Sequence, residues 1–228
     1  MHFRATIAAH RVVGCERVGT AEFPFESMSV VNVKRRIDLD VRHRRRVVTV
    51  VGSGRTADPC CAEVGRTIAT LGYDLLTGGG RGVMEAVSRA FFETTPRRGL
   101  VIGVIPALVE PLARLEWRQP TAVEYDVPRG YPNEWVELAI YTHLPDSGPE
   151  GTLRSSRNHI NVLSADVMIA LPGREGTAAE IWLATQYGVP IVAYGDHHEE
   201  VAQGVRRATS IDDVSGFLVE HLGRPSWA

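Results

Sequence analysis

The stretch LPGREGTAAE at residues 171–180 carries residue types that bind or act on a small anion. Thr177 and Glu180 match the capping-box pattern, in which a threonine caps a helix and a glutamate three residues later reaches back to the backbone N–H of the cap. That pattern alone would explain Glu180 as a structural residue. The stretch also follows an apolar run and so lies at the expected end of a parallel strand, where ligand sites occur. The residues leave both roles of Glu180 open.

Two further glycine turns follow apolar runs. Gly52-Ser53-Gly54 comes after VVTVV, and the GGGRG stretch at 78–82 has four glycines in five positions. Glycine permits positive φ and close approach of a ligand, and the helix that follows offers free N–H groups, so a phosphate is the expected ligand. Neither turn completes the G-x-x-x-x-G-K-S/T or the G-x-G-x-x-G pattern, because no lysine is available and Ala57 replaces the third glycine. We expect neither a nucleoside triphosphatase nor a nicotinamide cofactor.

Strand and helix patterns alternate through most of the chain. The expected strands are residues 47–51, 73–77, 100–106, 135–144, 167–171 and 190–194, and the expected helices are residues 57–71, 82–93, 152–164, 176–187 and 211–222. Strands that are apolar along their length and alternate with helices predict an α/β fold. We expect a doubly wound, mostly parallel, Rossmann-like sheet with helices on both faces, in a single domain. The three glycine turns would then meet at the carboxyl ends of the strands.

Arg157 lies on the expected 152–164 helix, roughly one turn from Leu153 and from Ile160. At that spacing it would flank the buried stripe of the helix and keep its charge in solvent. The spacing therefore favours a bystander arginine.

Histidines, cysteines and tryptophans add little to the site. We predict no metal site, because His143 and His159 have no metal-ligand spacing that would join them to Asp146 or Asp166. The cysteines lack such spacing too and are expected to be structural: Cys15, Cys60 and Cys61. Trp117, Trp135 and Trp182 could stack on a ring, although an aromatic in a large core is usually there for packing; only Trp135, which follows Asn133 and Glu134, is a candidate worth testing.

The charge is distributed unevenly along the chain. Residues 1–46 hold ten Lys or Arg against five acids, whereas residues 47–228 hold fifteen against twenty-two. We interpret residues 1–46 as a basic N-terminal extension and residues 47–228 as the phosphate-binding domain, and we expect no nucleic-acid partner. No apolar run approaches the ~20 residues of a membrane span, and a signal-peptide core is absent, so a cytoplasmic protein is expected.

Several strings together resemble a known family. GGGRGVMEAVSRA, VIGVIP, SRNHINVLSADVMIALPGREGTAAEIWLA and YGVPIVAYG, in this order within residues 47–195, look like the lonely guy family, long mislabelled as lysine decarboxylases, whose signature is P-G-G-x-G-T-x-x-E. The resemblance implies a Rossmann-like homodimer with its site at the dimer interface. It also implies hydrolysis of the N-glycosidic bond of a nucleoside 5′-monophosphate, mostly of cytokinin type, with no cofactor required.

The resemblance also assigns roles to residues. It implies catalytic roles for Arg157 and Glu180, and phosphate binding at the P-G-G-x-G-T turn. A carboxylate beside the anomeric carbon would stabilise the charge that develops on the ribose and orient the attacking water, and the arginine would grip the phosphate or hold the leaving base. The candidate ligand-binding residues are Gly52, Ser53, Gly54, Gly79, Gly80, Gly82, Met84, Asn158, Pro172, Gly173, Arg174, Glu175, Gly176 and Thr177.

Two departures from the family pattern point to an alternative. Arg174 stands at the second glycine of the turn, and Asn158 replaces the lysine that follows the arginine. The Arg157-Asn158 pair and the stretch NEWVELAIYTHL at 133–144 are closer to a sister branch that includes molybdenum-cofactor carrier proteins. The alternative function is therefore a non-catalytic protein that binds and protects a pterin phosphate. Pyridoxal-phosphate decarboxylation is excluded, because the only lysine, Lys34, lies outside the resembling region.

Overall fold

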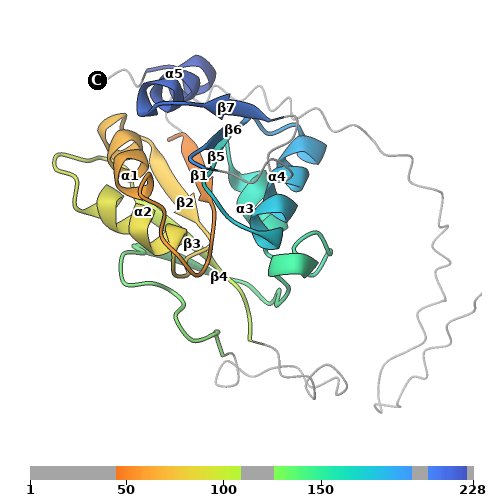
Figure 1. Ribbon diagram of the computed structural model, residues 1–228. Coiled ribbons are helices and arrows are strands. Elements are labelled where there is room, and N and C mark those ends of the chain that lie inside the picture. The colour runs from red at the N-terminus through yellow and green to blue at the C-terminus, as the bar shows by residue number, and fades with distance from the viewer. Residues whose placement is uncertain (1–44, 109–125, 197–204, 225–228) are drawn as a thin grey trace, which may run out of the picture. The chain divides into compact units, whose positions relative to one another are not determined.

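The computed structural model describes residues 45–108, 126–196 and 205–224. A seven-stranded sheet forms its centre, with helices packed against both faces (Figure 1). The strands are β1 Val47–Val51, β2 Asp74–Thr77, β3 Val101–Ile105, β4 Leu138–Tyr141, β5 Val167–Ala170, β6 Ile191–Tyr194 and β7 Arg206–Ala208. The helices are α1 Cys61–Thr70, α2 Val83–Phe92, α3 Asn158–Ser164, α4 Glu175–Tyr187 and α5 Ile211–Leu222, with a 3-10 turn, η1, at Gly148–Glu150.

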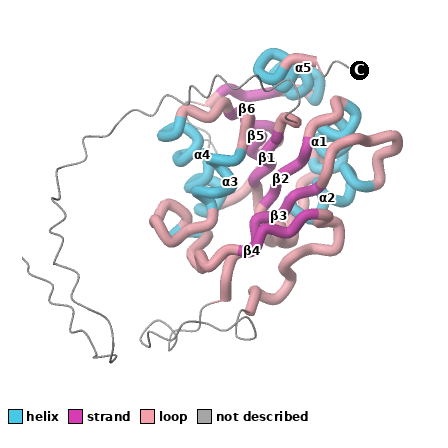
Figure 2. The backbone as a smooth tube through the Cα atoms, turned by 180° about the vertical axis from the view of Figure 1, so that it is seen from behind, coloured by secondary structure: helices cyan, strands magenta, loops and turns pink. Residues whose placement is uncertain are grey.

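The strands run in the order β4-β3-β2-β1-β5-β6-β7, and every neighbouring pair is parallel (Figure 2). The chain fills the sheet outward from β1 to β4 and then returns to place β5 on the other side of β1. The direction of winding therefore reverses between β1 and β5. A crevice opens at such a switch point beyond the carboxyl ends of the strands, which is where ligands bind in doubly wound sheets.

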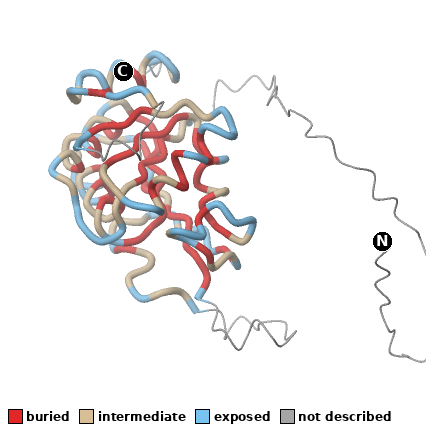
Figure 3. Tube along the Cα trace, turned by 45° about the vertical axis from the view of Figure 1, so that its right-hand side comes forward, coloured by how far each residue is buried: buried red, intermediate tan, exposed pale blue. Residues whose placement is uncertain are grey.

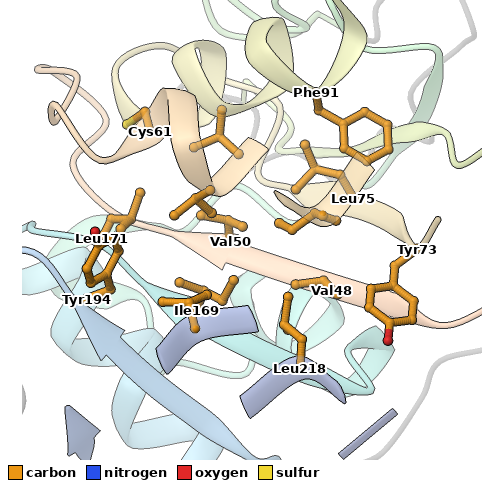
Figure 4. Packing of buried hydrophobic residues seen from close by; sticks show 14 of the residues in the cluster. Val48, Val50, Cys61, Tyr73, Leu75, Phe91, Ile169, Leu171, Tyr194 and Leu218 are labelled. Atoms are coloured by element: carbon orange, nitrogen blue, oxygen red, sulfur yellow. The ribbon is translucent and has the colours of Figure 1, made fainter. Parts of the chain in front are cut away.

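The two faces of the sheet are covered by different helices. Side chains of α1, α2 and α5 form one apolar cluster with the sheet, and side chains of α3 and α4 form a second one on the opposite face. Successive residues of β5 alternate between the clusters, with Val167 and Ile169 in the first and Met168 and Ala170 in the second. Figure 3 shows the buried chain at the centre of the described part, and Figure 4 shows Val48, Val50 and Ile169 packed with Phe91 and Leu218.

The predicted fold class is confirmed, and three of the predicted elements are wrong in extent. The helix expected over 57–71 begins only at Cys61. The helix expected over 152–164 begins only at Asn158, because Ser156 forms a bridge with Asp146 and the Ser155 hydroxyl donates to the carboxylate of the same aspartate. The strand expected over 135–144 is confined to β4. Strand β7 was not predicted, because its two arginines are exposed and the segment lacks the apolar pattern of a strand.

Cys60 and Cys61 are free thiols at the start of α1. Burial raises the pKa of Cys61 to about 11, and burial together with Asp58 raises the pKa of Cys60 to about 12. Both thiols are therefore protonated at neutral pH, as expected of structural cysteines. Cys15 lies outside the described residues. Within the ranges described above, no helix is both long and apolar enough to cross a membrane.

Candidate functional site

A cavity of about 540 Å³ opens at the switch point of the sheet. The turn after β1 and the turn after β5 form its centre, and they are joined by a 3.0 Å hydrogen bond from the Ser53 N–H to the Pro172 carbonyl. The predicted site residues that line it are Gly52, Ser53, Gly54, Met84, Arg157, Asn158, Arg174, Glu175, Gly176, Thr177 and Glu180. The fold therefore brings residues from four separate stretches of the sequence to one place.

Five predicted ligand-binding residues are not among those that line the cavity: Gly79, Gly80, Gly82, Pro172 and Gly173. A methyl group on Gly82 would overlap the Ser53 carbonyl, and the Val83 N–H donates to that carbonyl at 2.9 Å, so the second glycine turn packs on the first. A methyl group on Gly173 would overlap the Thr177 hydroxyl in the same way. Within the fold, these glycines let the turns pack closely enough to shape the cavity.

Helix α4 directs its N-terminal end at the cavity. It begins at Glu175, its N-cap is Arg174, and no side chain caps its first N–H groups. Those N–H groups have no partner inside the helix and carry partial positive charge, so this end attracts an anion. Thr177 is the third residue of α4 and cannot be its cap, so the capping-box interpretation of Thr177 and Glu180 is wrong.

Arg157 is buried and lies at the N-cap position of α3, with only 5% of its surface exposed. Its guanidinium rests directly on Gly78, where any methyl group would overlap both terminal nitrogens. Nε and Nη1 have no hydrogen-bond partner within the described residues. A buried arginine with unused donors is costly, and this burial contradicts the expectation that Arg157 keeps its charge in solvent.

Glu180 projects into the same cavity from the second turn of α4 and is 9% exposed. Its Oε1 accepts a hydrogen bond of 3.1 Å from Nδ2 of Asn161, which is itself fully buried. Burial raises the pKa of the Glu180 carboxyl, while the Arg157 charge and the Asn161 hydrogen bond act in the opposite direction. The net direction is upward, so desolvation outweighs the two favourable partners.

This raised pKa predicts how stability changes with pH. The charged form of Glu180 is disfavoured in the folded state, so its contribution to stability is fully present below the unfolded pKa of ~4.3 and is lost as pH rises through the higher folded pKa. Glu180→Gln removes this dependence. We expect the free energy of unfolding of the variant, relative to that of the wild-type protein, to increase from pH 4 to pH 8 in urea titrations.

The exposed Glu175→Gln on the same helix is the matched control for the loss of one charge from α4. A difference between the Glu180→Gln variant and the wild-type protein that decreases with rising pH would contradict the raised pKa.

Nine lining residues were not predicted from the sequence: Val50, Val51, Arg55, Thr56, Gly78, Tyr131, Ser147, Gly148 and Pro149. Gly78 belongs to the glycine-rich turn, and its contact with Arg157 gives the reason for its residue type. Tyr131 belongs to no periodic pattern in the sequence. Its ring contacts Gly80, and the residue lines the cavity. The residues at 147–149 belong to η1 and its N-cap, and they approach the first turn of α4 at Gly176.

The other residues considered from the sequence lie elsewhere. Trp135 contacts the Phe92 ring, with 5.6 Å between ring centroids, and lies under Arg89, away from the cavity lining. Trp182 is exposed on α4, against the expectation of core packing, and Trp117 lies outside the described residues. His159 hydrogen-bonds the Tyr187 hydroxyl at 2.6 Å. In the described part of the chain, no group of three or more His, Cys, Asp or Glu side chains is arranged to hold a metal ion.

Comparisons with known proteins agree with this fold. Residues 45–216 match the model of the SLOG cluster4 family. The structure is similar to the molybdenum cofactor binding protein from the phototrophic bacterium Rippkaea orientalis, with 26% identity and a TM-score of 0.58 over 78% of this chain and 98% of that one. It is also similar to the molybdenum cofactor carrier protein from Chlamydomonas reinhardtii, with 28% identity and a TM-score of 0.56 over 78% and 99%.

A more distant likeness extends over the same sheet. DNA processing protein A from Helicobacter pylori is 17% identical, with a TM-score of 0.52 over 80% of this chain and 84% of that one. At this identity the likeness shows the fold alone. Among curated proteins, none matches this chain.

Proposed function

Since the chain belongs to the SLOG cluster4 family, we propose that its cavity binds a phosphorylated nucleotide-like or pterin-like ligand and hydrolyses the N-glycosidic bond of a nucleoside 5′-monophosphate. The observation that carries this proposal is the juxtaposition of Glu180 and Arg157. Both are buried, both line one cavity, and two donors of the arginine lack partners within the described residues. Ionisable groups whose pKa is shifted by burial beside a charged partner, as that of Glu180 is beside Arg157, cluster at functional sites.

The phosphate would lie at the N-terminus of α4. The free N–H groups of its first turn, the Ser53 hydroxyl and the exposed Arg174 all border this part of the cavity. Backbone donors and the helix dipole favour an anion there, and Arg174 adds a full positive charge. This placement leaves Glu180, one helical turn further on, beside the sugar of the ligand.

Glu180 would carry the hydrolytic step. The electron pair of the C1′–N bond leaves with the ring, positive charge develops at C1′, and the oxygen of a water molecule bonds to C1′. The ionised carboxylate stabilises that positive charge and orients the water, whose proton ends on the released ring. Since burial raises the pKa of Glu180, Arg157 and Asn161 are needed to keep a working fraction of it ionised.

A non-catalytic carrier is the second candidate. This chain is similar to the two molybdenum-cofactor proteins named above over almost the whole length of each of them. A phosphorylated pterin fits the same features, because the helix N-terminus and Arg174 suit its phosphate, and Arg157 lines the rest of the cavity with a charged donor group. We also propose that the protein is a homodimer, that it is cytoplasmic and that it has no nucleic-acid partner.

The test is incubation of the purified full chain with a panel of nucleoside 5′-monophosphates, followed by chromatography for released base. We expect release, and we expect Glu180→Gln to lower kcat/KM by on the order of 10²-fold or more. Asp212→Asn, an exposed acid on α5, is the matched control and should retain full activity.

Saturable binding of a phosphorylated pterin by calorimetry, without release of base from any nucleotide, would replace the hydrolase with the carrier. Absence of binding to every phosphorylated ligand would refute both candidates.

A further inference from the structure

The two oxygens of the Glu180 carboxylate have different surroundings. Oε1 accepts a hydrogen bond of 3.1 Å from Nδ2 of Asn161. Oε2 accepts no hydrogen bond within the described residues, and it is not closed off from solvent. Since Glu180 is almost entirely buried and lines the cavity, Oε2 is the oxygen that remains open to a ligand there.

Asn161 reaches this carboxylate from α3 and does not itself line the cavity. It is fully buried, and its backbone N–H donates to the Arg157 carbonyl at 3.2 Å, so the two residues occupy successive turns of the same helix face. The Thr49 hydroxyl, in the middle of β1, donates to the Asn161 carbonyl at 3.4 Å. These contacts fix the backbone of Asn161, so its side chain approaches Oε1 from a defined direction.

Stability alone does not explain an amide at position 161. Its Oδ1 is buried and has no hydrogen-bond partner in the part of the chain that the structure describes. A buried polar atom without a partner is costly, and an apolar side chain of similar size would avoid that cost. The hydrogen bond that the amide does form goes to Glu180, so the effect of Asn161 is on that carboxylate.

Arg157 has a different effect on Glu180. Its guanidinium rests on Gly78, and it forms no hydrogen bond or ion pair with Glu180 within residues 45–108, 126–196 and 205–224. Its charge lowers the pKa of Glu180 from a distance. A nearby charge favours the ionised form but does not select one of the two oxygens, whereas the hydrogen bond from Asn161 does both.

From this arrangement we infer that Asn161 is a positioning residue, which holds Oε1 of Glu180 so that Oε2 is the oxygen that acts on the ligand. The inference rests on the proposed function and deepens it. Oε2 is then the atom that stabilises the positive charge at C1′ and orients the attacking water, and Asn161 contacts neither.

The other charged and titratable groups around Glu180 leave this assignment to Asn161. Those that border the cavity are Arg55, Tyr131, Arg157, Arg174 and Glu175. Of these, Arg157 is the group that acts on the pKa of Glu180. Among the elements that pack on α4, α3 also carries His159, which hydrogen-bonds Tyr187 instead, and η1 carries the exposed Glu150.

The first test uses Asn161→Leu and Asn161→Asp, which keep nearly the shape of the side chain and remove its N–H donors. With a hydrolysed nucleoside 5′-monophosphate, we expect kcat at neutral pH to decrease by on the order of 10- to 100-fold, the usual effect of one hydrogen bond to a charged group. KM should stay within about twofold, because the lost contact does not touch the ligand. The rise of kcat/KM with pH should move to higher pH, since loss of a donor to the ionised form raises the pKa of the carboxyl.

A second measurement needs neither ligand nor activity. The full chain is labelled with carbon-13 glutamate, its carboxyl signals are followed by NMR as pH is raised, and Glu180→Gln identifies the signal of Glu180. We expect the pKa of Glu180 to be higher in both Asn161 variants than in the wild-type protein. Val162→Ala is the matched control, because it removes packing from the next buried residue of α3 and should lower stability without moving this pKa.

An unchanged pKa of Glu180 in a folded Asn161→Leu or Asn161→Asp protein would overturn the inference, and so would a higher KM with unchanged kcat. Thermal unfolding of each variant shows whether it is folded. If the wild-type protein hydrolyses no nucleotide, the proposed reaction fails, and the NMR titration still decides whether Asn161 controls the Glu180 carboxylate.

Discussion

Gly78→Ala is expected to lower the affinity of the cavity for its phosphorylated ligand by on the order of 100-fold while leaving the fold intact. The added methyl group would overlap the Arg157 guanidinium, which rests on the Cα of Gly78. The backbone accepts alanine, because Gly78 does not have a positive φ. The arginine side chain must therefore move, and its charge leaves the position that it holds at the cavity wall.

A double-mutant cycle isolates this effect. Affinity is measured by calorimetry for the wild-type protein, Gly78→Ala, Arg157→Ala and the double variant. If Gly78 acts by seating the guanidinium, Gly78→Ala should have almost no further effect when Arg157 is already alanine. Gly216→Ala, whose methyl group would meet nothing within 4 Å, is the matched glycine control. Additive losses in the cycle would show that Gly78 contacts the ligand independently of Arg157.

The fold was predictable because its signals are local. Strands such as VVTVV are largely apolar, and three of them are followed by a glycine turn and a helical pattern, which is sufficient for a parallel, doubly wound sheet. The family resemblance, which is now confirmed, depends on the same ordered segments. The exposed β7 lacks that signal and was missed.

The environment of Arg157 was not predictable, because it depends on contacts between distant parts of the chain. The periodicity of 152–164 suggests a helix with Arg157 on its surface, but the bridge between Asp146 and Ser156 delays the helix to Asn158. The side chain then turns inward to reach Gly78, almost eighty positions earlier in the sequence. A pattern confined to neighbouring residues contains no information about such a contact.

The role of Glu180 was ambiguous for a related reason. Thr-x-x-Glu places two side chains on one face of a helix whether the threonine caps that helix or lies inside it. The start of α4 at Glu175 resolves the ambiguity, since it places Thr177 inside the helix and leaves Glu180 to Asn161 and the cavity. Helix boundaries are the least certain part of any interpretation from sequence, and here one boundary excludes the capping box that would have explained Glu180 as a structural residue.

The largest expected effect on stability comes from Gly65, a buried residue of α1 at the contact with α2. A methyl group at this position would lie 2.6 Å from the Val87 carbonyl oxygen and 2.9 Å from both the Ala90 Cβ and the Phe91 backbone nitrogen. Two of these atoms belong to the backbone of α2, so no side-chain rotation relieves the overlap, and the helices must move apart. We expect Gly65→Ala to lower the free energy of unfolding by about 1–3 kcal/mol.

Gly216→Ala sharpens the comparison, because it makes the same change inside α5 with open space around the new methyl group. There the higher helix propensity of alanine acts alone, and we expect a gain of about 0.5–1 kcal/mol. The two substitutions should therefore shift the urea midpoint in opposite directions. A stabilising effect of Gly65→Ala would mean that α1 and α2 pack less closely than the structure has them, and the apolar cluster between these helices and β1 would have to be looser as well.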